Sequence, residues 1–561
     1  MTQSNSRRKF IRNFSLGTVA VSTISLTACG GGDSDDRSVS FAHGVASGDP
    51  LADRVILWTR VTATGSGDLD VGWEIAEDSD FTKPVASGIV TTGAAQDYTV
   101  KVDATGLAAN RGYYYRFGSH GVLSPVGRTK TLPTGSVSRV RFAVFSCSNY
   151  PAGYFNVYAD AAKFDDIDVG LHLGDYIYEY AAGGYASQNA ASMGRVSQPA
   201  NEIITLSDYR LRYQQYRSDP DLQAVHARMP FITVWDDHEL TNDTWRDGAE
   251  NHDPATEGLW AGRRQMAIQA YHEWMPIRQP DPARPERIYR SFDFGNLLSL
   301  HMLDTRVIGR DKQLAYANYV GADRSFNGAA FLADVSAPGR QLMGAEQTAW
   351  LQSQMSKSKA TWQVLGQQVL MARMLLPAPM VLGTVGYAAY FAIAAKVRAG
   401  VALSATEQQQ LAATPIPYNL DAWDGYQAAR ETVLNMARTL DKNLVVLAGD
   451  THNAWASDLL DAGGQPVGVE FGVPSVTSPG FETYFPTYDP ATIATSMEQL
   501  IGPLQYAETA SRGFVVLTVT PSETRAEYRY VDTIRSKTYK ASVRKTLRTL
   551  PGPASRKILA A

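Results

Sequence analysis

The stretch VRFAVFSCSN, residues 140–149, decides the fold class of this chain, because a short and largely apolar run leads directly into polar residues. A run of this length and composition predicts a strand that is buried on both faces. Stretches of helical pattern separate it from further runs of the same kind, and this alternation predicts an α/β domain with a largely buried sheet. The further runs are DIDVGLHLGD (166–175), FITVWDDHE (231–239), LLSLHMLDTR (297–306), ATWQVLGQQV (360–369) and NLVVLAGDTH (443–452).

Four of these runs end in a cysteine, a carboxylate or a histidine, at Cys147, Asp175, residues 236–238 and residues 450–452. In open α/β sheets, ligands bind outside the carboxyl ends of the strands, so residues far apart in sequence meet there. Taken singly, each of these polar residues also has a purely structural explanation. The cysteine can be a buried thiol, a Gly-Asp pair can form a turn, and the acidic residues can lie in a solvated loop. Because all four together would need four separate coincidences, we predict one common site.

The side chains at and near these ends are of the types that bind metal ions. Carboxylate and amide oxygens suit hard cations such as calcium, whereas a thiolate or phenolate suits a transition metal such as ferric iron. A thiol beside a cation loses its proton, which gives a lone cysteine a function. The mixture predicts more than one metal ion. The candidate ligands are Cys147, Asp175, Tyr178, Asp236, Asp237, Asn242, Asp450 and His452.

Residues 39–135 follow a different pattern, in which short strands such as RVILWTRV and RGYYYRFGS alternate with turn residues. Such spacing predicts a small β-sandwich. Residues 136–139 are the predicted seam, and a catalytic domain over residues 138–532 follows, with a helical insertion at about residues 310–430. Within the insertion, residues 378–395 carry no charge, but Pro, Gly and small side chains make them weakly hydrophobic. We predict a buried or lid-forming helical segment there and not a membrane span.

The two ends of the chain bear on its location. Arg7 and Arg8 precede an uncharged run over residues 14–28, and the pair resembles a twin-arginine export signal. The run ends with LTA (26–28) directly before Cys29, and the sequence LTAC resembles a lipobox. We therefore predict a signal peptide over residues 1–28, lipidation of Cys29 and a flexible tether over residues 29–38; an ordinary signal peptide cleaved elsewhere is the alternative. The protein is then exported and anchored to a bacterial membrane, on the periplasmic side or at the cell surface.

Residues 533–561 are basic and contain no acidic residue. We predict a solvated, partly disordered tail there, with contact to anionic lipid headgroups as the alternative. The whole chain has 52 basic and 56 acidic residues, a net charge of −4 that offers nucleic acid no general attraction. Its two cysteines are too few for a disulfide framework.

Taken together, the motifs resemble the PhoD-like alkaline phosphatases, a branch of the metallophosphoesterases. FAHGVASGDPLADRVILWTRV (41–61) resembles the opening of that family's immunoglobulin-like N-terminal domain. FSCSN, HLGDYIYE, VWDDHE and LAGDTH follow in the family's order. The resemblance implies an α/β catalytic domain of the four-layer metallophosphatase type, a β-sandwich flanked by helices, preceded by a small all-β domain. It also implies ferric iron with one or two calcium ions; zinc or another divalent pair is the alternative.

The resemblance also implies roles for single residues. Cys147 and Tyr178 correspond to iron ligands, and Asp175 to the carboxylate shared between metals. DDHE stands where wider metallophosphoesterases have Gly-Asn-His-Asp/Glu, so Asp237 corresponds to a metal-binding Asn and His238 to the catalytic His. Asp450 and His452 correspond to a late Gly-His-x-His motif, whose first His is Asp in this chain. Asn242 corresponds to a calcium ligand. Gln367 and Gln368 lie at about the place of a middle His-containing motif.

The expected function is metal-dependent hydrolysis of phosphomonoesters or phosphodiesters. A metal-activated hydroxide attacks phosphorus, and His238 protonates or hydrogen-bonds the leaving oxygen. Arg306 follows an apolar run and is a candidate clamp for phosphate, with a surface salt bridge as the other interpretation. The expected substrate is a small phosphate ester. Three alternative functions remain: a phospholipase, a non-catalytic surface binding lipoprotein with structural metals, and a thiol hydrolase that uses Cys147 as its nucleophile.

Overall fold

The structure is a computed structural model that describes residues 37–561. The predicted signal peptide, Cys29 and residues 29–36 of the predicted tether lie outside the described residues. Within the described part of the chain, none of the helices combines the length and the apolar composition needed to cross a bilayer.

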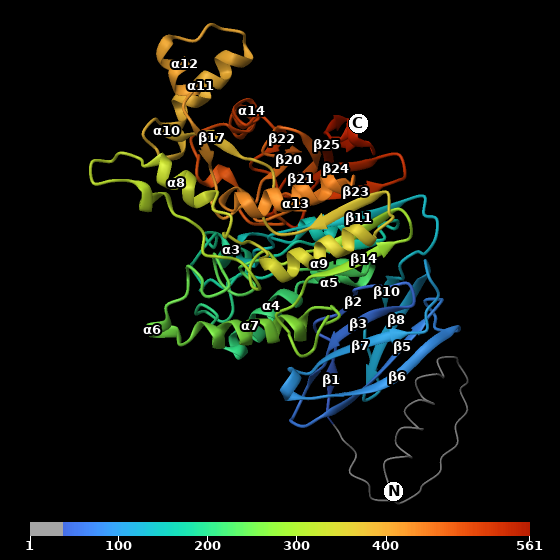
Figure 1. The fold of residues 1–561 in the computed structure, drawn as a ribbon. Helices are drawn as coiled ribbons and strands as arrows, with labels where there is room; N and C mark the ends of the chain where they lie inside the picture. Colours follow the sequence, from blue (N-terminus) through green and yellow to red (C-terminus); the bar gives the residue numbers. More distant parts are fainter. Residues whose placement is uncertain (1–36) are drawn as a thin grey trace, which may run out of the picture.

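A ten-stranded sheet within residues 37–561 forms the centre of the molecule (Figure 1). Its strands β11, β12 and β13 pair in parallel, so their carboxyl ends lie at one edge. In pairing order the strands are β26 (Leu559–Ala560), β25 (Ala541–Thr549), β24 (Thr524–Val531), β23 (Gly513–Val519), β11 (Val140–Phe145), β12 (Val169–His172), β13 (Phe231–Thr233), β2 (Val45–Gly48), β3 (Arg54–Arg60) and β7 (Thr99–Thr105).

A second sheet, of seven strands in the described chain, packs face to face with the first. Strands β15, β16, β19 and β21 are parallel in it. In pairing order the strands are β14 (Arg290–Phe294), β15 (Leu298–Met302), β16 (Trp362–Gly366), β19 (Asn443–Ala448), β21 (Pro466–Gly472), β20 (Ala454–Leu460) and β22 (Leu504–Glu508).

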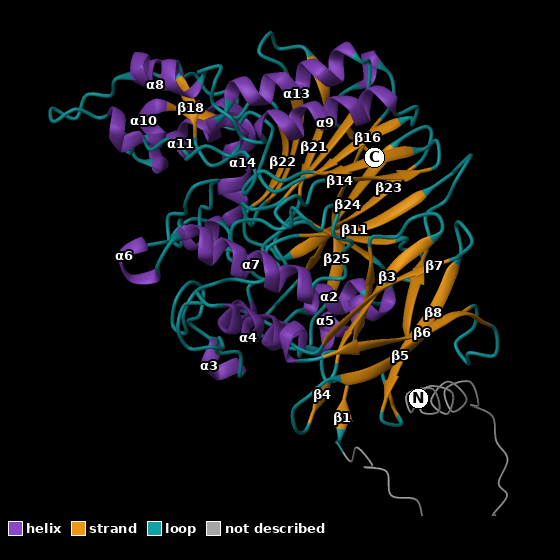
Figure 2. Ribbon diagram, turned by 60° about the horizontal axis from the view of Figure 1, so that its bottom comes forward, coloured by secondary structure: helices purple, strands orange, loops and turns teal. Residues whose placement is uncertain are grey.

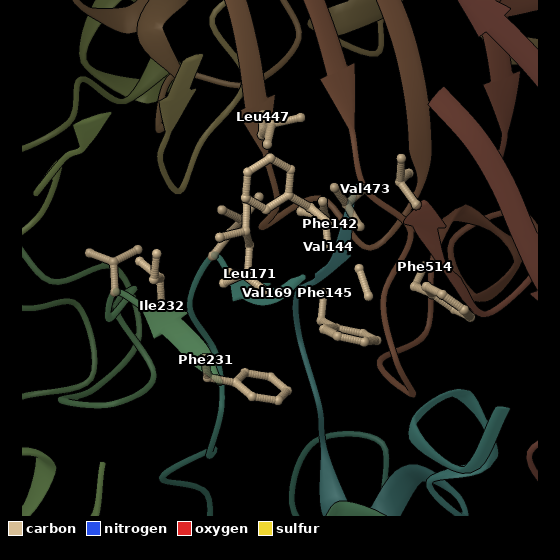
Figure 3. Packing of buried hydrophobic residues seen from close by; sticks show 14 of the residues in the cluster. Phe142, Val144, Phe145, Val169, Leu171, Phe231, Ile232, Leu447, Val473 and Phe514 are labelled. Atoms are coloured by element: carbon tan, nitrogen blue, oxygen red, sulfur yellow. The ribbon is translucent and has the colours of Figure 1, made fainter. Parts of the chain in front are cut away.

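The core lies between the two sheets and between each sheet and its helices. Successive strand side chains point to opposite faces; accordingly, Phe142 contacts Phe294 of the second sheet, with ring centroids 5.2 Å apart, whereas Phe145 contacts Tyr158 of α2 at 5.2 Å. Figure 3 shows side chains of β11, β12 and β13 gathered with Leu447 and Val473 in one cluster. Burial on both faces explains why residues 140–145 form a nearly continuous apolar run.

Helices cover the outer faces of both sheets (Figure 2), which gives four layers and confirms the predicted α/β class. The helices beside the ten-stranded sheet are α2 (Asn156–Ala161), α4 (Leu206–Arg217), α5 (Pro220–Arg228) and α7 (Trp260–Trp274). Those beside the seven-stranded sheet are α9 (Gly344–Lys357) and α13 (Gln427–Thr439), while the short α3 (Ala190–Met193) and α6 (Pro254–Glu257) lie in connections.

The N-terminal region is all-β, as predicted, but one of its sheets continues into the catalytic sheet. Strands β2, β3 and β7 join β13 through the pair Gly48 and Phe231. A Cβ atom at Gly48 would lie 2.1 Å from the Pro276 carbonyl oxygen, so only glycine fits at this junction. The opposing sheet contains β10 (Gly127–Lys130), β8 (Gly112–Ser119), β5 (Leu69–Ala76), β6 (Pro84–Thr92) and β9 (Val122–Leu123), and a separate pair is β1 (Val39–Ser40) with β4 (Thr62–Ala63).

Helices of the predicted insertion project from the body of the molecule (Figure 1). The uncharged residues 378–395 form α10 (Ala378–Val381) and most of α11 (Tyr387–Arg398), and α11 packs against α14 (Pro490–Leu500). The other elements here are α8 (Gly328–Val335), α12 (Ala405–Leu411), and the paired strands β17 (Leu375–Pro377) and β18 (Pro415–Pro417).

The prediction of a solvated, partly disordered tail over residues 533–561 is wrong. Strand β25 pairs with β24, and β26 pairs with β25, at the edge of the ten-stranded sheet. Leu547 and Ile558 are buried, and Arg548 and Arg556 are paired with Glu523 and Asp441. Because β26 pairs only with Leu547 and Arg548, most of β25 lies at the edge of the sheet. Basic residues are common on such edges, which explains why the strand has few apolar side chains.

Candidate active site

The candidate site lies in the loops that follow the carboxyl ends of β11, β12, β13, β15 and β19. Four residues in these loops, Cys147, Asp175, Asp450 and His452, have φ between 56° and 66°. Non-glycine residues rarely adopt this left-handed conformation, and such residues cluster at functional sites. The glycine before Asp175 permits close packing, because a Cβ atom at Gly174 would lie 2.4 Å from Cβ of Asp236.

Ligand atoms of Cys147, Asp175 and His452 lie within 4.8 Å of one another. The Tyr178 hydroxyl donates to Asp175 Oδ2 at 2.9 Å and lies 3.1 Å from His452 Nε2. Burial, and then the charge of Asp175, raise the pKa of the Cys147 thiol well above its usual value. The protein alone thus keeps this thiol protonated, and a cation at the site would be needed to form the thiolate. Thiolate, phenolate and imidazole together suit a transition metal.

Two further groups of potential ligands overlap with the first among the described residues. They are Asp175 with Asp237 and His238, and Asp236 with Asp237 and Asp450, again with ligand atoms within 4.8 Å. One carboxylate oxygen each of Asp175, Asp236 and Asp237 is buried without a hydrogen-bond partner. Because unpartnered buried carboxylates are costly, this arrangement fits cations bound among them.

The pKa values of these carboxyl groups are shifted in opposite directions. Burial raises the pKa of Asp236 to about 7 and raises that of Asp450 well above its usual value. Burial also opposes ionisation of Asp237, but Arg306 and then His238 lower its pKa to about 2. Asp237 is therefore an anion at neutral pH even without a metal ion.

His238 is held by a carboxylate that the sequence analysis did not single out. Its Nδ1 lies 2.6 Å from Oε2 of Glu179, and its ring stacks on Tyr178 with centroids 4.2 Å apart. Burial lowers the pKa of His238, but Glu179 and then Asp237 outweigh burial and raise it well above its ordinary value. The imidazole is therefore protonated and able to donate a proton. Glu179 ends the quoted motif HLGDYIYE, so its position beside Tyr178 was a usable signal.

Arg306 is completely buried, and the expectation of a surface salt bridge is wrong. Its guanidinium donates to Asp236, and lies 3.2 Å from Asp450 and 3.5 Å from Asp237. Asp421, in the loop after β18, also contacts this guanidinium at 2.8 Å. Asp421 follows no apolar run, so the strand-end pattern could not identify it.

Three other predicted residues, all amides, form hydrogen bonds with protein groups in the structure. The Asn242 amide oxygen accepts from the Tyr180 hydroxyl at 3.3 Å, and its amide nitrogen donates to Glu250 at 2.8 Å. Gln367 bonds within its own loop and accepts from Trp423 Nε1 at 3.1 Å, and Gln368 bonds backbone and side-chain groups of neighbouring loops. Glu239, a further acid of the DDHE motif, accepts the backbone N–H groups of residues 175, 176 and 236 and so fixes the loops.

The chain is similar to known proteins over most of its length. Residues 142–528 match the PhoD-like phosphatase family, and residues 27–133 match the N-terminal domain of PhoD-like phosphatases. Alkaline phosphatase D of Bacillus subtilis (strain 168) is 37% identical over 511 residues, which cover 88% of this chain and 78% of that protein. The solved structure of PhoD is 34% identical, with a TM-score of 0.75 and coverage of 93% of this chain and 92% of that one. These similarities confirm the predicted resemblance: the chain belongs to the PhoD-like phosphatase family.

Proposed function

We propose that this phosphoric ester hydrolase acts through ferric iron and calcium ions bound among its strand-end loops. The observation that carries the proposal is the overlap of the three ligand groups, in which Asp175 and Asp237 are each shared by two groups. Cys147, Tyr178 and His452 would hold the iron, and Asp236, Asp237 and Asp450 would hold calcium, with Asp175 between them. When bound, the cations neutralise phosphate charge, orient the ester and make a water molecule acidic.

His238 supplies the proton for the leaving oxygen. Its Nδ1 is engaged by Glu179, which leaves the other ring nitrogen for the ester. Glu179 fixes the orientation of the ring and keeps it protonated. Stacking on Tyr178 places the ring beside the residues that would hold the metal ions.

Arg306 is a positioning residue in this proposal and not a clamp for phosphate. Its donors are engaged by Asp236, Asp421 and Asp450, which leaves its guanidinium committed to the protein. It balances part of the negative charge of the carboxylates and holds Asp236 and Asp450 in place.

Elemental analysis combined with hydrolysis assays tests the proposal. Purified protein should contain iron and calcium and should release phosphate or alcohol from a monoester or a diester. If the purified protein contained zinc and neither iron nor calcium, the alternative of a pair of divalent ions would be favoured. Failure to hydrolyse any ester when supplied with iron and calcium would favour a binding lipoprotein, and full activity after chelation would favour the thiol nucleophile.

A phospholipid is a second candidate substrate, because an apolar pocket borders Asp450 and His452. We further propose export by the twin-arginine route and a lipid anchor on Cys29. Labelling cells with a radioactive fatty acid tests the anchor. The wild type should be labelled and Cys29→Ala should not, and label retained in Cys29→Ala would refute the anchor.

A further inference from the structure

A pocket of about 370 Å³ opens directly beside the proposed metal site. Asp450, Thr451 and His452, which include two of the proposed metal ligands, line the pocket. Its lining also includes Tyr484 and Tyr387, which are 71% and 37% exposed, so the pocket is open to solvent. A group attached to a phosphate at the metal site could therefore enter this pocket without crossing another part of the protein.

One wall of the pocket is aromatic and is built from two parts of the chain. Tyr387 belongs to α11 of the insertion, whereas Phe481, Tyr484 and Phe485 belong to the loop before α14. The rings of Tyr387 and Phe485 meet edge to face at 4.8 Å, and those of Phe481 and Phe485 at 5.8 Å. Such contacts hold the rings in place, so the apolar wall is preformed.

The charges around the pocket exclude a second anionic group. Among the described residues that line it, none is Lys or Arg. A carboxylate or second phosphate among the aromatic side chains, out of reach of the proposed metal ions, would lose its hydration without gaining a cation. An uncharged apolar group loses little and covers aromatic surface.

One polar group in the pocket lacks a partner. The Tyr418 hydroxyl is buried without a hydrogen-bond partner, and Tyr418 is one of the residues that line the pocket. Unpaired buried hydroxyls are unfavourable, so this one is suited to a hydrogen bond with a bound molecule. An ester oxygen next to an apolar group would provide that bond.

We infer that this pocket binds the organic part of the substrate, and that the enzyme prefers phosphate esters carrying an uncharged apolar group, an aromatic ring fitting best. The inference rests on the proposed function, because it places the phosphate at the proposed metal site.

Phosphonates test the inference without turnover, because each carries one organic group on phosphorus that cannot be hydrolysed away. Calorimetry of the metal-loaded enzyme compares methylphosphonate, benzylphosphonate, hexylphosphonate and 4-carboxybenzylphosphonate, whose carboxylate lies on the far side of the ring from phosphorus. Benzylphosphonate should bind at least about tenfold more tightly than methylphosphonate, since one added apolar group in a pocket is worth about that factor. 4-Carboxybenzylphosphonate should bind more weakly than benzylphosphonate.

Tyr387→Ala combined with Tyr484→Ala removes part of the apolar wall while changing two side chains that are partly exposed. The preference for benzylphosphonate should fall to within about twofold, with the affinity for methylphosphonate unchanged. Leu259→Ala, at a residue that is 81% exposed on another part of the chain, should change neither affinity. Tyr418→Phe keeps the ring and should leave the affinities for the phosphonates unchanged, because they lack the ester oxygen, but it should raise the KM for phenyl phosphate, which has one.

The outcomes separate this inference from the proposed function. If the wild type hydrolyses esters but binds methylphosphonate and benzylphosphonate equally, or keeps its preference in the double variant, the inference is refuted and the proposed function stands. If no ester is hydrolysed, the proposed function fails whatever the affinities. Tighter binding of hexylphosphonate than of benzylphosphonate would support an apolar group but assign a chain in place of a ring.

Discussion

Nδ1 of His238 lies 2.6 Å from Oε2 of Glu179, and both side chains are buried beside the proposed metal site. Glu179 also accepts the backbone N–H of Asn242 at 2.8 Å, which fixes the carboxylate itself. The pair therefore sets both the orientation and the protonation of the imidazole. A histidine held in this way can donate a proton at a pH at which an isolated histidine would be neutral.

Glu179→Gln should lower kcat by roughly 10- to 100-fold, because it removes the support of a residue next to metal ligands. It should also change the pH profile of kcat. Glu179 raises the pKa of His238, and activity that needs protonated His238 is lost as pH rises through that pKa. Without the carboxylate the basic limb should move to lower pH.

Glu179→Asp is the matched control, since it keeps the charge and should leave the basic limb nearer its wild-type position. An unchanged profile in Glu179→Gln would show that His238 is not the proton donor.

Arg306→Ala should destabilise the metal-free protein by about 3–5 kcal/mol, because it leaves buried carboxylates without their cation. Calcium should restore much of the lost stability by occupying the same region. Thermal unfolding with chelator and then with calcium measures both effects. The exposed pair of Arg284 with Glu346 provides the control, and Arg284→Ala should have little effect on unfolding. A stable, calcium-insensitive Arg306→Ala protein would contradict the positioning role.

Gly48→Ala should cost about 1–3 kcal/mol of unfolding free energy, because its Cβ atom would overlap backbone at the junction of β2 and β13. Urea unfolding measures the loss. Gly112→Ala is the control, since its Cβ atom would meet its nearest neighbour at 3.9 Å. Equal effects of the two substitutions would mean that the junction tolerates a side chain.

Tyr178→Phe should remove the optical absorption of an iron–phenolate bond and weaken iron binding, while keeping the ring that stacks on His238. Absorption spectra and iron content of the purified variant measure both. Tyr185→Phe is a suitable comparison, because the Tyr185 hydroxyl also contacts His452, at 3.2 Å, but is not an expected iron ligand. If Tyr185→Phe lost the absorption band and Tyr178→Phe kept it, Tyr185 and not Tyr178 would be the iron ligand.

The sequence predicted the α/β class because residues such as Phe142 and Phe145 are buried on opposite faces of one strand, which makes the run continuously apolar. It also indicated which residues follow the strands, and the structure brings Cys147, Asp175 and His452 close together. Asp421 could not be predicted, because it reaches Arg306 from an irregular loop of the insertion.

Strand β25 was missed for a different reason. Its basic side chains are typical of an edge strand, and the same composition is typical of a disordered tail. The continuation of the N-terminal sheet through Gly48 was also not predictable, because it depends on a single backbone pair between segments distant in sequence.

The most direct test of the central claim is the metal content and ester hydrolysis of the wild type and Cys147→Ser, purified in parallel. The wild type should contain iron together with calcium, and Cys147→Ser should lose iron and hydrolysis together while it retains calcium. Zinc alone in the wild type, or full iron content and activity in Cys147→Ser, would contradict that claim.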